Sequence, residues 1–386
     1  MAAAGTLMVP KFLQALGTGN HLAAAGQKIV VIIQLSGGND GLNTIIPVRN
    51  DIYYRLRPKL GISRENSLAL NDETGLNPNL PVFKELYDGG NLAILNGVGY
   101  PNPDRSHFRS MDIWHTASDS RDYLNTGWLG RYLDAQCAGC PHPTQILELD
   151  DMLSLALKGD HFNGIASKDP RRLFATSSQD YLKKLVDHHQ EHEPVADYLY
   201  KTLADTLQSA DYLFKESRRH PSTSSYPNTE LGKSLQTIAS LSFSEVNTRV
   251  YYVSLGSFDT HINQEAQQKR LFTELNDAVG AFVKDLKANG KFNDLLLFTF
   301  SEFGRRVNQN ASGGTDHGTA NNMFFISGAL KKKGLINPLP DLADLDNNDL
   351  KYAVDFRQVY QMVLKDWLGT DARQILGGEF GPLKIV

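Results

Sequence analysis

Three short apolar runs in this sequence each stop at a group of polar side chains of the kinds that bind metals and substrates. The runs are Ile29–Leu35, Val250–Leu255 and Leu295–Phe300. Their length and their β-branched or aromatic content predict buried strands of a parallel or mixed sheet. In open α/β sheets, ligands bind beyond the carboxyl ends of the strands. Polar residues far apart in the sequence are therefore expected to meet at one edge of the sheet, and this convergence points to an enzyme.

Helical segments separate these runs. Apolar residues recur at helical spacing over 263–288, and Gly290 follows as a stop signal. This helix lies between two of the predicted strands, which gives a strand–helix–strand crossover. Strand and helix signals also alternate across residues 29–150. Residues 151–245 are mostly polar and helical in pattern, so we expect a helical insertion there within a single α/β domain over 29–386.

Composition excludes several classes of function. The 386 residues are 41% hydrophobic and 21% charged, with a formal net charge of -4, as in an ordinary globular protein. No basic face is evident, so nucleic acid is not an expected partner. No apolar run reaches the roughly 18 residues of a transmembrane helix, so we expect no membrane span.

The first 28 residues differ from the rest of the chain. Residues 1–28 begin with small and apolar side chains, and Ala23-Ala24-Ala25 resembles a processing site, but the basic start of a signal peptide is missing. Two interpretations stay open, the remnant of an export signal and an ordinary N-terminal amphipathic helix.

The two cysteines, Cys137 and Cys140, form a Cys-Ala-Gly-Cys motif. Such a pair can be a redox motif, half of a zinc site or a local disulfide. The lack of a second pair excludes a four-cysteine zinc site. Export of the protein would favour a disulfide, and two reduced thiols are the alternative.

The polar groups that follow the strands suit a metal. The candidate ligands are Asp40, Asn43, Asp259, His261, Glu302, Asp316 and His317. Carboxylates combined with imidazoles suit zinc, manganese or iron, and oxygen-rich sites favour magnesium or calcium. Each motif alone also has a structural explanation, as a capping Asp, a Glu–Arg salt bridge or a turn. The joint placement after strands favours ligation.

Other residues suit an ester substrate and a nucleophile. Arg305 or Arg306 could bind an anion, because guanidinium matches phosphate or sulfate geometry. Ser106 opens a predicted helix, where free N–H groups and the helix dipole favour an anion. Ser106 or Asp104 could instead be a simple helix cap. His107 could be a metal ligand, a general acid or a phosphate contact.

An ordered set of motifs runs through the chain from about residue 28. They are Ser36-Gly-Gly-Asn-Asp-Gly-Leu-Asn43, Arg105-Ser-His-Phe-Arg-Ser-Met-Asp112-Ile-Trp114, Phe258-Asp-Thr-His261, Ser301-Glu-Phe-Gly-Arg305, Gly314-Thr-Asp-His-Gly318, Val354-Asp-Phe-Arg357 and Asp366-Trp-Leu-Gly369. This set resembles the bacterial "domain of unknown function 1501" family. That family is grouped with the alkaline phosphatase and sulfatase superfamily, and its members often carry twin-arginine export signals.

The resemblance implies a three-layer α/β sandwich, in which a central mixed, mostly parallel sheet has helices on both faces. It also implies a site with two metals and a nucleophile at a helix start. By position, Asp40 or Asn43 stands for the first-strand ligand and Ser106 lies near the nucleophile. Asp259 and His261 resemble the Asp and His of one metal site, and His317 resembles its final His.

One residue departs from the superfamily pattern. Phe303 follows Glu302 where an Asp-His pair is usual, and a phenylalanine cannot bind a metal. The second metal site is therefore expected to be impaired or absent. No Cys-x-Pro-x-Arg motif is present, so a formylglycine nucleophile is not expected.

These observations lead to one functional hypothesis and one alternative. The first is an exported, periplasmic or secreted, metal-dependent hydrolase of phosphate or sulfate esters, with Ser106, His107 and Arg305 in catalysis. It would use one or two divalent ions, zinc first and magnesium, manganese or calcium as alternatives, and act on a small or polymer-bound anionic ester. The alternative is a non-catalytic exported binding or assembly protein with a degenerate metal site. The sequence does not specify an oligomeric state.

Overall fold

A nine-stranded mixed sheet forms the centre of the molecule. The computed structural model describes residues 27–137, 144–187, 194–244 and 246–386. Along the sheet the strand order is β11-β5-β10-β9-β1-β8-β6-β7, with β14 also paired to β5. Every pairing is parallel except those of β10 with β5 and β9. The strands are β1 (Ile29–Leu35), β5 (Leu92–Gly99), β6 (Ile146–Glu148), β7 (Ile165–Ala166), β8 (Val250–Leu255), β9 (Leu295–Phe300), β10 (Asn321–Ile326), β11 (Gly334–Leu335) and β14 (Val354–Asp355).

The three predicted strands lie side by side in this sheet. β1 pairs with β8 on one side, Val30 opposite Val250, and with β9 on the other, Val30 opposite Leu296. All residues of β1 and β9 are buried, as expected for strands covered on both faces. Because the three strands are parallel, their carboxyl ends reach the same edge of the sheet.

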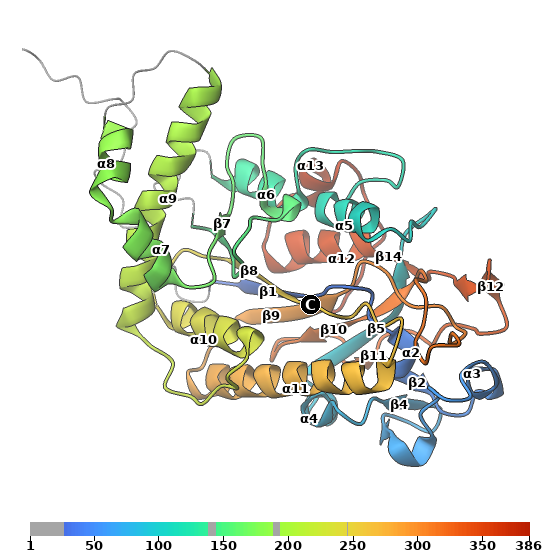
Figure 1. Ribbon diagram of the computed structural model, residues 1–386. Helices are drawn as coiled ribbons and strands as arrows, with labels where there is room; N and C mark the ends of the chain where they lie inside the picture. The colour runs from blue at the N-terminus through green and yellow to red at the C-terminus, as the bar shows by residue number, and fades with distance from the viewer. Residues whose placement is uncertain (1–26, 138–143, 188–193, 245) are drawn as a thin grey trace, which may run out of the picture.

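Helices cover both faces of the sheet and complete a three-layer sandwich (Figure 1). Successive side chains of a strand point to opposite faces, so Val30 and Ile32 pack into one core and Val31 and Ile33 into the other. The first core is closed by α5 (His107–Thr116), α6 (Trp128–Gln136), α12 (Phe356–Met362), π-helical η3 (Val363–Trp367) and α13 (Ala372–Leu376). The second core is closed by α4 (Pro81–Asp88), α10 (Glu230–Phe243) and α11 (Gln264–Ala288). The predicted three-layer α/β fold is confirmed.

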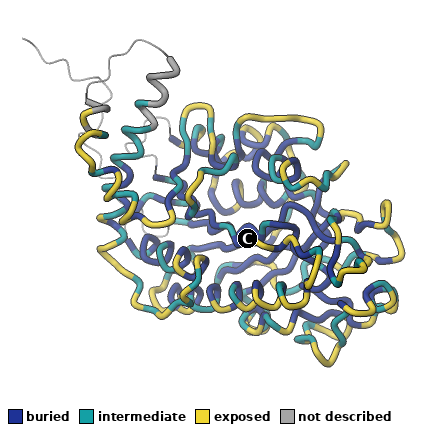
Figure 2. The backbone as a smooth tube through the Cα atoms, in the orientation of Figure 1, coloured by how far each residue is buried: buried dark blue, intermediate teal, exposed yellow. Residues whose placement is uncertain are grey.

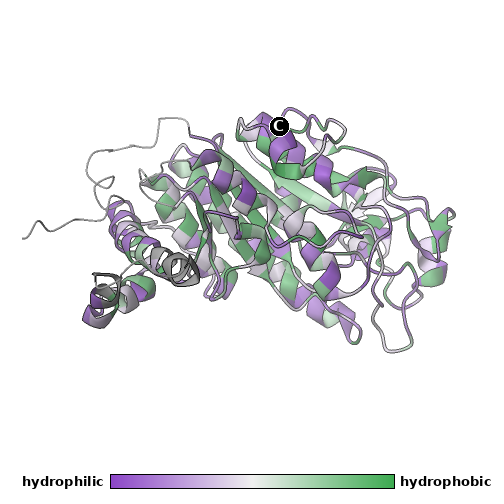
Figure 3. Cartoon of the chain, turned by 90° about the horizontal axis from the view of Figure 1, so that it is seen from above, coloured by the Kyte–Doolittle hydropathy of each residue, from purple (hydrophilic) through white to green (hydrophobic). Residues whose placement is uncertain are grey.

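The burial pattern agrees with these layers. Figure 2 shows the strands as buried backbone inside a shell of intermediate and exposed helices and loops. Figure 3 shows apolar residues concentrated in the central strands and in parts of the flanking helices. The predicted helix at 263–288 is α11, which starts at Gln264 and ends at Ala288.

Two small sheets and several short helices lie outside the main sheet. A three-stranded sheet has the order β2-β4-β3, and β12 pairs with β13 in a hairpin. Their bounds, and those of the neighbouring helices, are α2 (Gly41–Thr44), β2 (Ile45–Pro47), α3 (Asp51–Leu56), η1 (Arg64–Asn66), β3 (Leu68–Ala69), β4 (Thr74–Leu76), η2 (Leu155–Leu157), β12 (Leu345–Asp346) and β13 (Asp349–Leu350).

The segment expected to be a helical insertion divides into two parts. It contains α7 (Pro170–Ser177), α8 (Asp180–Asp187), α9 (Pro194–Arg219) and α10. Of these, α7 packs on α9, whereas α10 packs on α11 and β8 as part of the helix layer. β7 also belongs to this segment and forms an edge of the main sheet.

Two predictions fall partly outside the described residues. Residues 1–26 of the expected export signal or N-terminal helix lie there, and so does Cys140. Cys137 is buried and disulfide-bonded. Among the described residues, no helix combines the length and the apolar character needed to span a bilayer.

Candidate metal centre

The loops after β8 and β9 and the start of α5 meet beyond the carboxyl edge of the sheet. Asp259 and His261 lie in the loop after β8, and Glu302 comes directly after β9. His317 lies in the loop between β9 and β10, where Arg305 and His317 form an isolated antiparallel bridge. His107 is the first residue of α5. The expected convergence is therefore present for the residues that follow β8 and β9.

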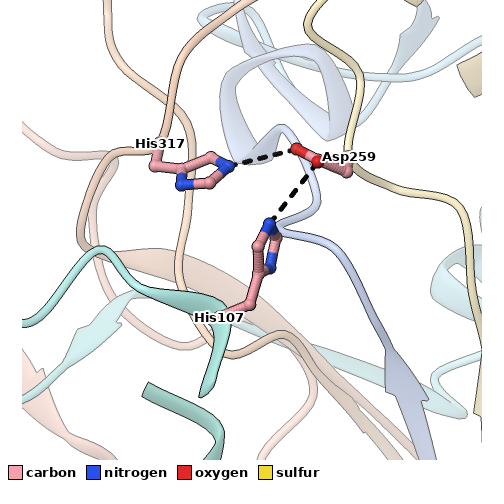
Figure 4. Close-up of side chains that lie close together, drawn as sticks. All are labelled: His107, Asp259 and His317. Atoms are coloured by element: carbon pink, nitrogen blue, oxygen red, sulfur yellow. Dashed lines mark hydrogen bonds and ion pairs between the residues drawn. The ribbon is translucent and has the colours of Figure 1, made fainter. Parts of the chain in front are cut away.

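Asp259 stands at the centre of three histidines. Its Oδ1 lies 3.1 Å from His261 Nε2 and 3.1 Å from His317 Nε2. Its Oδ2 lies 3.5 Å from His107 Nε2. The two nitrogens His261 Nε2 and His317 Nε2 are themselves 3.0 Å apart. Figure 4 shows His107 and His317 pointing at the Asp259 carboxylate from two different directions.

Each of these histidines has an oxygen acceptor at its other ring nitrogen. His107 Nδ1 lies 3.0 Å from Glu302 Oε1, and His261 Nδ1 lies 3.1 Å from Asp316 Oδ1. His317 Nδ1 lies 2.8 Å from the backbone carbonyl oxygen of Arg105. From these partners we assign the ring proton to Nδ1, as in histidines that bind metals through Nε2. All three Nε2 lone pairs then face Asp259.

This arrangement fits a divalent cation. The Nε2 atoms of His261 and His317 are 3.0 Å apart, and their lone pairs repel each other unless a proton or a cation lies between them. Ligand atoms around tetrahedral zinc, with bonds near 2.1 Å, are about 3.4 Å apart, and the separations measured here are 3.0 to 3.5 Å. His107, Asp259 and His317 also place one ligand atom each within 4.8 Å of one another. The donor set of imidazole and carboxylate suits zinc or manganese better than calcium.

The charges around the cluster shift several pKa values. Burial alone would raise the pKa of Asp259, but the hydrogen bond from Arg305 and the contact with His317 lower it to about 2. Burial would also raise the pKa of Asp316, but hydrogen bonds from Asn310 and His261 lower it below its usual value. The hydrogen bond to Glu302 raises the pKa of His107. Asp259 is therefore ionised across the physiological range, ready to bind a cation.

Glu302 lies behind the cluster. It is buried, and its Oε1 accepts a hydrogen bond from the backbone N–H of Gly37 at 2.8 Å as well as contacting His107. Gly37 has a φ of +117°, and a Cβ there would lie 2.4 Å from the backbone nitrogen of Asp259. The turn after β1 can therefore approach the cluster this closely only because it carries a glycine. In this position Glu302 orients His107 from the side opposite Asp259.

The Phe303 ring occupies the space beside Glu302. Its centroid lies 4.9 Å from that of His107 and 4.6 Å from that of His317. A Cβ on Gly38 would lie 2.3 Å from the same ring, so the turn after β1 packs directly on it. An apolar ring thus fills this side of the cluster, in line with the expectation that a second metal site is impaired.

Arg305 uses its guanidinium to hold the loops together. It is buried, and Nε donates to the Gly38 carbonyl at 2.6 Å while Nη1 donates to the Thr315 carbonyl at 2.8 Å. Nη2 lies 2.7 Å from Asp259 Oδ1 and also donates to the carbonyl oxygens of Gly37 and Phe258. We had expected Arg305 to bind substrate. The structure instead gives it the role of fixing Asp259 against the surrounding loops, because each of its three nitrogens is buried and donates to a protein oxygen.

Asp40 and Asn43 have other partners than the cluster. Both are buried. Asp40 Oδ2 lies 2.6 Å from Arg57 Nη1 and also accepts from Gln264. Asn43 Oδ1 accepts from Tyr53 and from Arg57, at 2.8 and 2.9 Å. The expectation that they bind a metal is not supported by this geometry, because their oxygens neutralise and orient Arg57.

Ser106 precedes the cluster residue His107. It is exposed and occupies the N-cap position of α5, but its side chain makes no capping hydrogen bond. Asp104 Oδ1 accepts from the Ser106 backbone N–H at 2.7 Å and does not cap the helix either. Ser106 is therefore exposed to solvent one residue before His107.

Sequence reasoning missed two groups that shape this site. The carbonyl oxygen of Arg105 fixes His317, and Gly37 allows the close approach of the first turn. The only sign of the Arg105 contact in the sequence is that Arg105 lies next to Ser106 and His107. The contact itself uses the backbone carbonyl of Arg105, which every residue type has, so the sequence could not predict it.

The solved structures that match this chain are remote from it. A lipoteichoic acid synthase (LtaP) from Listeria monocytogenes matches with a TM-score of 0.42 and 10% identity over 96% of this chain and 80% of that chain. A protein in the alkaline phosphatase superfamily from Vibrio parahaemolyticus matches with a TM-score of 0.41 and 11% identity, over 95% of this chain and 77% of that one. The periplasmic domain of EptC from Escherichia coli matches with a TM-score of 0.40 and 10% identity, over 89% and 82%. These values are too low to transfer a function.

Sequence comparison is more decisive about the family. No curated protein matches the chain significantly. One family model, described as "Protein of unknown function (DUF1501)", matches residues 95–382. That range contains the start of α5, the loops after β8 and β9, and the Asp-His-Gly loop. The expectation raised by the ordered motifs is thus confirmed, and the chain belongs to the DUF1501 family.

Proposed function

We propose that this protein is a metal-dependent hydrolase of phosphate or sulfate esters, centred on Asp259, His261 and His317. The observation that carries the proposal is the mutual distance of 3.0 to 3.1 Å among Asp259 Oδ1, His261 Nε2 and His317 Nε2. The Nδ1 atoms of His261 and His317 already have partners in Asp316 and the Arg105 carbonyl, and Arg305 donates to Asp259 Oδ1 itself. A divalent cation bound there, zinc first, would polarise the ester and stabilise the charge that develops on its oxygens.

The residues around this centre suit attack on a tetrahedral ester. In the proposed reaction, Ser106 Oγ forms a bond to phosphorus or sulfur while the bond to the alcohol oxygen breaks. His107 Nε2 accepts the serine proton and returns it to the leaving alcohol. Water then hydrolyses the seryl ester and releases phosphate or sulfate. Glu302 keeps His107 oriented, and the free N–H groups at the start of α5 favour the anionic group.

The two candidate functions differ in the role that they give to His107. Three protein ligands leave a fourth position open for substrate, as in catalytic zinc sites, whereas four protein ligands close the site. His107 Nε2 lies 3.5 Å from Asp259 Oδ2 and can complete a closed set. The second candidate function is therefore a non-catalytic protein with a structural metal. The Phe303 ring, packed on His107 and His317, also favours it.

We further propose that the protein is exported to the periplasm or secreted. The disulfide at Cys137 supports this location, since disulfides persist in oxidising compartments. Alkylation of the purified protein before and after reduction tests it. A chain that takes up alkylating reagent fully without reductant contradicts the proposal.

Metal analysis and an ester screen test the proposed function. We expect about one divalent ion per chain and turnover of a phosphomonoester, a phosphodiester or a sulfate ester. His317→Ala should lose both metal and turnover, and Ser106→Ala should keep the metal and lose turnover. His161→Ala, which removes an exposed histidine, is the matched control and should change neither.

His107→Ala then decides between the two functions. In a hydrolase with an open site, the variant keeps its metal and loses about 10²- to 10⁴-fold in turnover, the usual contribution of a general acid–base group. In a closed structural site, it loses metal affinity, and wild type turns over none of the esters. Equal metal content and equal turnover in His317→Ala and wild type would remove the site assignment.

A further inference from the structure

The β12–β13 hairpin lies outside the main sheet (Figure 1) and contacts two segments that border the metal centre. Its second strand carries Asp349, whose side chain is fully buried. Asp349 Oδ2 forms an ion pair with Nη2 of Arg105, a residue 244 positions earlier in the chain. The carbonyl oxygen of the next residue, Leu350, accepts a hydrogen bond from Thr319 Oγ1 at 2.5 Å. The hairpin therefore joins the segment before α5 to the loop before β10.

Both contacts bear on His317. Thr319 lies two residues after His317 in the same loop, and the backbone carbonyl of Arg105 lies 2.8 Å from His317 Nδ1. A carbonyl oxygen can only accept, so this contact holds the ring proton on Nδ1 and leaves the lone pair on Nε2. Nε2 then lies 3.1 Å from Asp259 Oδ1. The place of the Arg105 carbonyl thus decides where the Nε2 lone pair points.

The side chain of Arg105 is anchored by Asp349. Nε and Nη2 lie on one edge of the guanidinium, the edge that can pair with both oxygens of a carboxylate. Nη2 makes the ion pair with Asp349 Oδ2. Within the described part of the chain, Arg105 Nε and Asp349 Oδ1 are both buried and have no hydrogen-bond partner, so these two atoms can complete the paired arrangement. A buried carboxylate needs a partner of this kind.

We propose that Asp349 is a positioning residue for His317 and that it acts through Arg105. The ion pair holds Arg105 in place, the Arg105 carbonyl keeps the ring proton of His317 on Nδ1, and Nε2 stays turned toward Asp259. This role requires no contact between Asp349 and a metal. The orientation of the ring stands by itself, whereas its consequence for metal binding rests on the proposed function.

The ring tautomer of His317 in the metal-free protein tests this orientation. Nitrogen-15 NMR shifts of the ring, measured at about pH 8 where imidazole is neutral, distinguish a proton on Nδ1 from one on Nε2. We expect the Nδ1–H tautomer in wild type. In Asp349→Ala we expect this preference to be lost, with a population of the Nε2–H tautomer that free histidine favours in water.

Asp344→Ala is the matched control for this change. Asp344 directly precedes the hairpin and forms an ion pair with Lys351 on its other side, with both side chains at least half exposed. The control thus removes an aspartate ion pair from the same hairpin without touching Arg105. We expect it to keep the wild-type tautomer of His317.

Zinc affinity gives a second readout. We expect Asp349→Ala to bind zinc about 10-fold more weakly than wild type, at the lower end of the range for groups that hold metal-site histidines. Arg105→Ala should show a similar loss, and its half-exposed side chain makes it the milder change to the fold. The double variant should lose no more than either single variant, because the two side chains act through one contact. Asp344→Ala should bind zinc as wild type does.

Three results would overturn the inference. They are a wild-type tautomer of His317 in Asp349→Ala, additive losses of zinc affinity in the double variant, and equal losses in Asp349→Ala and Asp344→Ala. A lower thermal midpoint combined with the wild-type tautomer and wild-type zinc affinity would show that Asp349 only stabilises the fold. Denaturant unfolding curves check that each variant is folded at the temperature of the NMR and zinc measurements.

Failure of the proposed function gives different results. A wild type that binds no zinc, with a changed His317 tautomer in Asp349→Ala, contradicts the proposed metal centre and supports the positioning role. Zinc binding without turnover of any ester contradicts the hydrolase alone. A wild-type ring with its proton on Nε2 contradicts the contact with Arg105 and therefore the inference.

Discussion

At the scale of single residues, the role of a side chain depends more on the groups that it contacts than on its residue type. Asp40 and Asp259 both follow a buried strand, and in the sequence they are equally good ligands. In the structure Arg57 lies 2.6 Å from Asp40, whereas Asp259 has three imidazole nitrogens within 3.5 Å. Arg57 carries no motif, so the sequence offers no sign that Asp40 is already neutralised.

The Glu302–His107 contact leads to a prediction at this scale. In Glu302→Ala, His107 Nδ1 loses its acceptor, so the ring is no longer held with its Nε2 lone pair toward Asp259. We expect a loss of about 10- to 100-fold in metal affinity or in activity, as for other partners of metal-site histidines. Isothermal titration with zinc and an esterase assay measure the two. An unchanged value for both would show that Glu302 does not orient His107.

A second prediction concerns Glu148, which is buried at the end of β6. Burial raises its pKa from 4.5 to about 7, although a hydrogen bond from the Ser154 backbone N–H opposes the shift. The protonated form is therefore favoured on folding, so its contribution to stability is complete below pH 4.5 and is lost as the pH rises through 7.

Glu148→Gln removes this titration. We expect the free energy of unfolding of the variant, relative to that of wild type, to increase as the pH rises from 4.5 to 8. The increase should reach about 3 kcal/mol at pH 8. Denaturant unfolding at several pH values measures the difference. A difference that stays constant with pH would contradict the raised pKa.

At the scale of elements, the turn after β1 positions the metal centre. Gly37 accepts no side chain because a Cβ would lie 2.4 Å from the Asp259 nitrogen, and its φ of +117° is one that other residues avoid. Gly290, after α11, also has a positive φ of +67° but faces open space. A side chain at either position would strain the backbone, but only at Gly37 would it also clash with neighbouring atoms.

We predict different outcomes for Ala at the two positions. Gly290→Ala should cost only the left-handed backbone strain, about 1 to 2 kcal/mol. Gly37→Ala should cost more than this and should also displace Asp259, so that metal affinity falls. Unfolding curves and metal titration of both variants check this. Equal metal affinity in Gly37→Ala and wild type would show that the loop after β8 can move aside.

The sequence predicted some of these elements well. The runs that became β1, β8 and β9 are apolar at all but one position each, and α11 has a helical apolar period followed by Gly290. The antiparallel placement of β10 between β5 and β9 was not predictable, since a short buried strand has the same pattern in either direction. The role of Arg305 in fixing Asp259 depends on four backbone carbonyls, which side-chain patterns do not reveal.

At the scale of the whole molecule, the metal centre joins segments that are far apart in the chain. One is the start of α5, one follows β8 and one precedes β10. A cation that binds the folded state alone stabilises it by RT ln(1 + [L]/Kd), about 2.7 kcal/mol at a concentration 100 times Kd.

We therefore expect added zinc to raise the thermal midpoint of the metal-free protein by several degrees, and EDTA to reverse the rise. His317→Ala should show little or no rise. Scanning calorimetry of wild type, His317→Ala and His161→Ala gives the comparison. A similar rise in all three proteins would place the bound ion elsewhere.

The central position of β1 has a consequence for how the chain folds. Its two neighbours in the sheet begin at Val250 and Leu295, so the first strand to be synthesised waits for most of the polypeptide before it can pair. Contacts of such sequence separation carry a large loop-closure entropy and slow folding. The hydrophobic Ile29–Leu35 segment therefore stays unpaired through most of the synthesis of the chain, and unpaired strands of this kind are prone to aggregate.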